Sequence, residues 1–134
     1  PMDLTDPKLF YPRPRATPSN IVYVYNGYHG NTSPEIYNDL IAKAIQESLP
    51  EFTFIYSADL RLPHEQMPEV YADCFILLRL TKADAAALTV QEFQKMGIPA
   101  VHNQSQYGWK WNNLDDIVTH IRYAHNHQPC LKTT

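Results

Sequence analysis

The chain has 134 residues, 44% of them hydrophobic, and a formal net charge of −3. This length suits one domain with a real core and is too short for two domains of ordinary size. No apolar stretch approaches the roughly 20 residues that cross a bilayer, and the acidic balance argues against nucleic-acid binding, which usually needs a basic excess. We therefore expect a single globular domain with no transmembrane segment and no nucleic-acid partner.

Two cysteines, Cys74 and Cys130, make a poor disulfide framework and favour a reducing compartment. The first 20 residues have neither the apolar core nor the cleavage pattern of a secretion signal, so we expect a cytoplasmic protein. His125 and His127 lie near Cys130 and could suggest a metal site. Alternate histidines before a thiol in a terminal segment are more typical of a frayed helix end, so we expect no metal.

Residues 1–20 are rich in proline, which favours extended backbone: Pro1, Pro7, Pro12, Pro14 and Pro18. We interpret this segment as a linker or as an arm packed on the domain. A disordered tail is the alternative.

The first predicted strand is the β-branched and aromatic run from Ile21 to Tyr25. After a loop, Ser33-Pro34-Glu35 has the residues of a helix start, and apolar residues at helical spacing carry that helix to about Ser48. Phe52 to Tyr56 is the second strand. This part of the chain predicts strand, helix, strand.

The second half continues the same alternation. A short helix is expected near Glu65, and Phe75 to Leu80 has the continuous apolar character of a strand buried on both faces. Thr89 to Glu92 resembles a capping box at the start of a helix that ends at Gly97. Ile98 to Val101 forms the next strand, and Asn113 caps a last helix.

This alternation predicts an α/β fold, a Rossmann-like parallel sheet with helices on both faces, in a single domain. We place the domain at residues 21–127, followed by a tail at 128–134. Open sheets of this kind bind ligands at the carboxyl ends of their strands.

Polar side chains follow each predicted strand and should meet at that edge. The mixture of cations, amides and a carboxylate suits a phosphorylated, hydroxyl-rich ligand, although strand-exit loops are polar in many proteins because they face water. The candidate residues are Gly27, His29, Gly30, Arg79, Lys82, Asp84, Thr89, Glu92, His102 and Asn103.

Several of these residues have two possible roles. Gly27 to Gly30 could let backbone amides approach a phosphate, but the loop is no established phosphate-binding motif. Lys82 could supply a cation or be an ordinary surface residue. Glu92 could complete the cap with Thr89, hold a ribose diol, or do both. The aromatic loop around Trp109 and Trp111 is either a lid over a ligand or packing against the sheet.

The stretch from about Phe52 to Asn103 resembles the donor-binding half of GT-B glycosyltransferases. The likeness is to the large retaining group in which an acidic residue is followed, after seven intervening positions, by a glutamate at a helix start. Asp84 and Glu92 have this spacing here. Met96-Gly97, Ile98-Pro99 and Val101 then match the character of the family's next positions.

The resemblance implies that a nucleotide-diphosphate sugar binds at the sheet edge, with no metal or other cofactor held by the protein. Glu92 would hold the ribose and Asp84 would reach the sugar. The family's Arg and Lys after the first strand of this half are missing here, so a cation for the diphosphate would have to come from Arg79 or Lys82. An acceptor glycan or lipid would bind through an N-terminal half that is absent from this chain.

The first hypothesis is therefore the donor-binding domain of a glycosyltransferase. The alternative is a non-catalytic α/β module that binds a nucleotide or a protein. The run Ala85 to Ala87 favours this alternative, because relatives in the family tend to have glycine after the acidic residue. A flavodoxin-like domain is a more remote possibility.

Overall fold

The computed structural model describes residues 3–28, 33–82 and 87–129, so the predicted site residues His29, Gly30 and Asp84 lie outside the described residues. Four strands form one parallel sheet in the order β2-β1-β3-β4. They are β1 (Ile21–Val24), β2 (Thr53–Tyr56), β3 (Cys74–Leu78) and β4 (Ala100–Val101). The predicted single-domain α/β fold with a Rossmann-like parallel sheet is confirmed.

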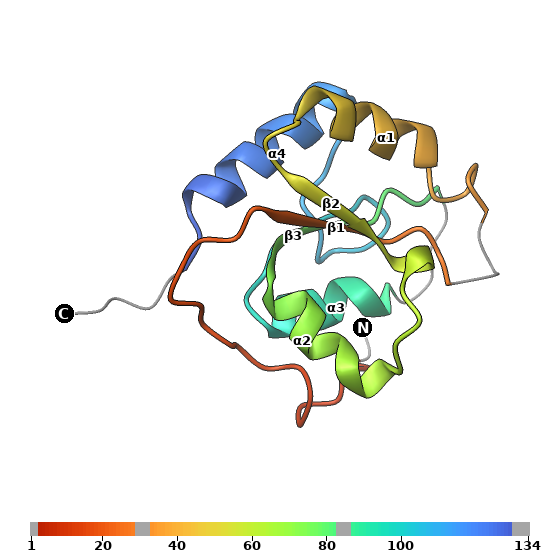
Figure 1. Ribbon diagram of the computed structural model, residues 1–134. Coiled ribbons are helices and arrows are strands. Elements are labelled where there is room, and N and C mark those ends of the chain that lie inside the picture. The colour runs from red at the N-terminus through yellow and green to blue at the C-terminus, as the bar shows by residue number, and fades with distance from the viewer. Residues whose placement is uncertain (1–2, 29–32, 83–86, 130–134) are drawn as a thin grey trace.

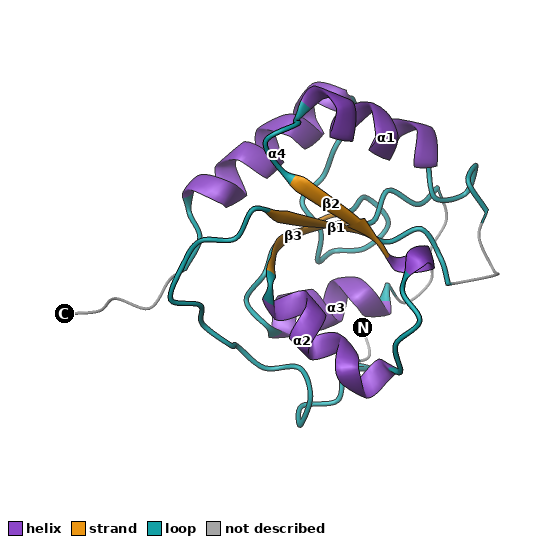
Figure 2. Cartoon of the chain, viewed as in Figure 1, coloured by secondary structure: helices purple, strands orange, loops and turns teal. Residues whose placement is uncertain are grey.

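Two layers of helices enclose this sheet, as Figure 1 shows. The helices are α1 (Asp39–Ser48), α2 (Met67–Ala72), α3 (Leu88–Lys95) and α4 (Leu114–Asn126), with 3-10 turns η1 (Ser57–Asp59) and η2 (His64–Gln66). Helices α1 and α4 cover one face, and α2 and α3 cover the other (Figure 2). Among the described segments, no helix has the length and apolar content that crossing a bilayer demands.

Successive side chains of β1 point to opposite faces of the sheet, so this strand contributes to the core on both faces. Val22 and Val24 pack with the apolar residues of α1 and α4, whereas Tyr23 packs with those of α2 and α3. All five residues of β3 are buried, as its unbroken apolar sequence predicted. The central strands are therefore fixed from both faces, which sets the position of the residues at their ends.

The strand register brings the carboxyl ends together at one edge. Val24 of β1 pairs with Tyr56 of β2 and with Leu78 of β3, and Leu78 pairs with Val101 of β4. Strand β2 lies next to β1 on one side, and β3 lies next to β1 on the other side. The strand order therefore reverses between β1 and β3. Open α/β sheets bind ligands at such a switch point.

The predicted start of the first helix at Ser33 is wrong, because α1 begins at Asp39. Asn38 adopts a left-handed conformation with φ 55°, and its side-chain amide donates to the carbonyl of Leu80 at 2.5 Å. The preceding residues form hydrogen-bonded turns, including one from the Tyr37 N–H to the Ser33 carbonyl. A long-range contact that local sequence does not reveal therefore interrupts the expected helix.

The predicted capping box at Thr89 is also wrong. Helix α3 begins at Leu88, and its N-cap is Ala87 at φ 47°, which makes no side-chain cap hydrogen bond. Two other predicted ends are confirmed: the Asn113 side chain accepts from the Asp116 N–H at 2.9 Å, and Gly97, at φ 77°, follows α3. Thr89 and Glu92 are therefore available for contacts other than capping.

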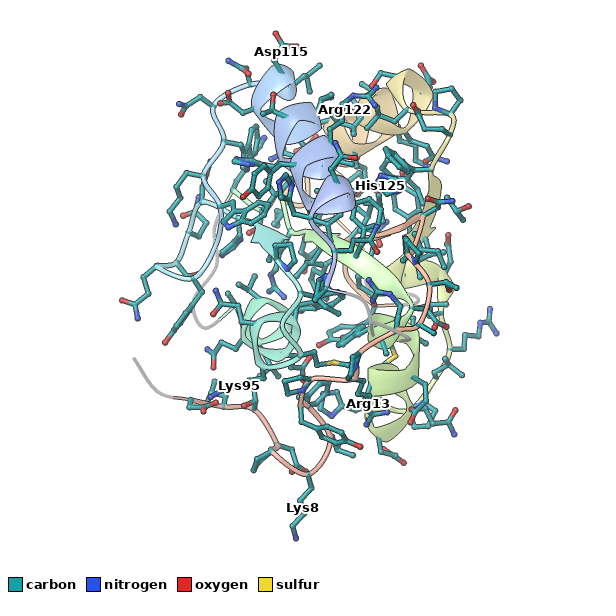
Figure 3. The ribbon with its side chains drawn as sticks, turned by 90° about the vertical axis from the view of Figure 1, so that its left-hand side faces the viewer. Lys8, Arg13, Lys95, Asp115, Arg122 and His125 are labelled. Carbon is teal, nitrogen blue, oxygen red and sulfur yellow. The ribbon has the colours of Figure 1, made fainter. Side chains whose placement is uncertain are left out.

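The proline-rich arm, residues 3–20, packs along α2 and α3 before it enters β1 (Figure 1). Phe10 is 2% exposed and belongs to the core on that face. The Arg15 guanidinium donates to the carbonyls of Ala72 at 2.7 Å and Cys74 at 3.0 Å. Figure 3 shows Arg13 against the body of the protein, where it pairs with Glu69 of α2.

The thiol of Cys74 at the start of β3 should be unreactive in the native protein. Its side chain is buried, and burial raises the pKa of the Cys74 thiol to about 12. Because alkylation needs the thiolate, we expect native Cys74 to react with iodoacetamide at pH 8 about 1,000-fold more slowly than in the unfolded chain. Peptide mass spectrometry measures this ratio, and equal labelling in native and urea-unfolded protein would show that the thiol is accessible.

Candidate functional site

A cavity of about 200 Å³ opens at the carboxyl ends of the central strands. Three of the residues predicted from the sequence line it together: Arg79 after β3, and Thr89 and Glu92 in α3. The other walls are mainly aromatic and apolar and come from β1, from residues 57–64 and from α2. The cavity lies at the switch point between β1 and β3.

A carboxylate–imidazole pair forms one wall of this cavity. Glu92 Oε2 lies 2.6 Å from His64 Nε2, a distance typical of a charge-assisted hydrogen bond. The two side chains differ in exposure, since 3% of the Glu92 side chain and 55% of the His64 side chain is exposed. Both residues line the cavity, and the imidazole is the more exposed member of the pair.

Aromatic rings support this pair from behind. The Tyr71 hydroxyl donates to Glu92 Oε1 at 3.4 Å, and the ring of Phe10 in the arm lies 5.3 Å from the His64 ring. Burial raises the pKa of the Glu92 carboxyl, and the hydrogen bonds from His64 and Tyr71 oppose this shift. Burial also raises the pKa of Tyr71 well above its usual value, so its hydroxyl stays protonated near neutral pH.

The Arg79 guanidinium is a cationic group at the cavity. It donates to Thr89 Oγ1 at 2.5 Å and lies over the Tyr25 ring, with its central carbon 4.1 Å from the ring centroid. Stacking on an aromatic face helps to hold the planar fork in place. Thr89 and Tyr25 thus orient a cation toward the space that Glu92 and His64 also face.

A polar network joins the exits of β1 and β2 beside the cavity. Ser57 Oγ accepts from the Asn26 N–H at 2.9 Å and donates to the Gly27 carbonyl at 2.6 Å. Asn26 Oδ1 accepts from the Ala58 N–H at 3.0 Å. Gly27 has φ 100°, a conformation that favours glycine, but it does not line the cavity. These contacts shape the loop after β1.

Three other predicted site residues lie outside the cavity lining: Lys82, His102 and Asn103. His102 is fully buried, and its Nδ1 lies 2.9 Å from the Arg79 carbonyl. The Asn103 side chain exchanges hydrogen bonds with the backbone of Trp111, at 2.7 and 2.8 Å. Lys82 is exposed, and its backbone N–H donates to Ile36.

Sequence reasoning did not identify His64, Tyr71 or Tyr25 as site residues. His64 and Glu92 are 28 positions apart, and no local motif links them. One signal was present: His64 lies in the connection that leaves the carboxyl end of β2 and returns to β3, the strand before Arg79. The contact of this connection with α3 appears only in the folded protein.

A larger cavity, of about 790 Å³, lies between the arm, the turn before β4 and the end of α4. Its walls include Phe75, Met96 and Tyr123. Arg13 and Arg15 also line it, but Arg13 pairs with Glu69 and Arg15 is held by backbone carbonyls and by Gln128. We therefore place the candidate site in the smaller cavity, which combines a buried carboxylate with an imidazole and a guanidinium.

Within the described residues, no three histidine, cysteine, aspartate or glutamate side chains gather as a potential metal centre. Comparisons with protein-family models, with curated proteins and with solved structures find no match. What the site binds must therefore be inferred from its own chemistry.

Proposed function

We propose that the chain binds a nucleotide-diphosphate sugar at the carboxyl edge of its sheet and acts as the donor-binding domain of a glycosyltransferase. The observation that carries this proposal is the meeting of Arg79, Thr89 and Glu92 in one cavity at the β1/β3 switch point. Arg79 was selected as a strand-exit residue, Thr89 as a helix-start residue and Glu92 from the family resemblance, and all three line the same cavity. A guanidinium suits the diphosphate and a carboxylate suits hydroxyl groups of the ribose.

The size of the cavity limits how much of the ligand it encloses. About 200 Å³ is below the roughly 300–1,000 Å³ of most small-molecule pockets. The cavity therefore suits one ring and part of the diphosphate, and the remaining groups would extend over its rim. An isolated donor half should consequently bind its ligand weakly and catalyse little, because the second wall of the cleft belongs to the acceptor half.

The proposal predicts saturable binding of at least one sugar nucleotide. Calorimetric titration with UDP-glucose, UDP-N-acetylglucosamine and GDP-mannose measures it directly. Glu92→Gln and Arg79→Gln each remove a charge-assisted contact, so each should raise the Kd about 10- to 100-fold. Glu47→Gln is the matched control, because Glu47 is exposed on α1 at the opposite face of the sheet.

Unchanged affinity in both site variants would contradict the proposed site. Absence of binding by all three compounds would favour the second candidate, a non-catalytic α/β module. One observation favours that candidate already: the Glu92 side chain is 3% exposed and its Oε2 is already hydrogen-bonded to His64. The same observation leads to the inference below.

A further inference from the structure

His64 is the more exposed member of the carboxylate–imidazole pair that lines the cavity. The Glu92 side chain is 3% exposed and that of His64 is 55% exposed. Glu92 Oε2 is hydrogen-bonded to Nε2 of the imidazole. Within the described part of the chain, His64 Nδ1 makes no hydrogen bond to the protein.

We propose that His64 is a phosphate-binding residue, that Glu92 positions its imidazolium, and that His64 and Arg79 together form a two-cation clamp for a diphosphate. This inference rests on the proposed nucleotide-sugar site and adds the way in which the site holds its anion. A carboxylate hydrogen-bonded to one nitrogen fixes the ring and stabilises its protonated form, which leaves Nδ1–H to donate to a phosphate oxygen.

Carboxylate, phenol and guanidinium groups surround His64. From α3 it faces Glu92, from α2 Tyr71, and from the arm the apolar ring of Phe10. Tyr23 and Tyr25 of β1 and Arg79 line the same cavity. Burial raises the pKa of Tyr23, Tyr25 and Tyr71, so these phenols stay neutral, and an arginine stays charged throughout this range.

The proposal therefore predicts tighter binding of a diphosphate at lower pH. A histidine ordinarily gains its proton between pH 8 and 5. The bridging diphosphate of a sugar nucleotide is a diester and does not titrate in this interval, so a change in affinity reports on the protein. We expect the Kd of UDP-glucose or GDP-mannose to fall about tenfold from pH 8 to pH 6.

Three variants separate this role from a structural one. His64→Gln should bind weakly at both pH values and lose the pH dependence, whereas His64→Lys should keep a cation and bind at both. Glu92→Gln should reduce the pH dependence, because the imidazolium loses its partner. His127→Gln, an exposed histidine that contacts the carbonyl of Tyr123 in its own helix, should behave as wild type.

A diphosphate without a nucleoside separates the failure of this inference from the failure of the proposed function. P1,P2-dimethyl diphosphate, followed by NMR of the His64 ring protons, should bind weakly and more tightly at pH 6. Suppose that dimethyl diphosphate binds more tightly at pH 6 and that no sugar nucleotide has a lower Kd than this compound. The diphosphate clamp is then supported, and the nucleotide-sugar proposal fails. If sugar nucleotides bind equally well at both pH values, or His64→Gln keeps the wild-type pH dependence, the clamp is wrong.

Discussion

Replacing Phe10 with alanine should lower the free energy of unfolding by about 3–5 kcal/mol, the usual cost of truncating a buried phenylalanine. Phe10 is 2% exposed although it belongs to the proline-rich arm. Its ring lies 5.3 Å from His64 and 6.0 Å from Tyr71. The substitution should therefore also loosen the wall of the candidate site.

Urea unfolding followed by tryptophan fluorescence measures this loss. Tyr11→Ala is the control, because Tyr11 is the next residue in the arm and is 46% exposed, so it should cost less than about 1 kcal/mol. A loss below 1 kcal/mol for Phe10→Ala would mean that the arm does not share the core of the domain. Equal losses for the two variants would lead to the same conclusion.

Gly108→Ala should cost about 3 kcal/mol or more, because the added methyl group would overlap the end of β4. A Cβ at this position would meet the carbonyl oxygen and the Cβ of His102. His102 cannot move easily, since its N–H donates to the Trp109 carbonyl at 2.9 Å and the Trp109 N–H donates to the Ala100 carbonyl at 2.7 Å. The close approach of these two backbones requires glycine.

Gly97→Ala gives the matched comparison, because a Cβ there would have nothing within 4 Å. Its cost should come only from the left-handed conformation at φ 77°, about 1–2 kcal/mol. Thermal unfolding of both variants should therefore rank Gly108→Ala as clearly less stable. The reverse order would show that the loop after His102 yields to the added methyl group.

The fold could be predicted because its signals are local. The apolar run of β3 and the alternation of strands with amphipathic helices are visible within windows of a few residues. The helix ends were predicted where one residue decides them, as at Asn113, and missed where a distant contact decides them, as at Asn38.

The site could be predicted only in part, because its partners come from distant segments. Arg79 and Glu92 follow directly from strand ends and from the family resemblance, and both line the cavity. His64 meets Glu92 only through the crossover from β2 to β3. His102 follows β4 as expected, but it turns into the protein toward the Arg79 carbonyl. Whether a residue at a strand end is buried depends on the loop that covers it. The sequence of the strand alone does not reveal this.

Mapping a bound sugar nucleotide on the protein tests the central claim most directly. Two-dimensional 1H–15N NMR with UDP-glucose or GDP-mannose should shift the amides of Arg79, Thr89 and Glu92, together with the ring signals of His64. The amides of residues that line the larger cavity should not move; these are Arg13, Arg15, Tyr123, Ala124, His127 and Gln128. Saturable shifts confined to that second set, or no shifts with either compound, would contradict a donor site at the carboxyl edge of the sheet.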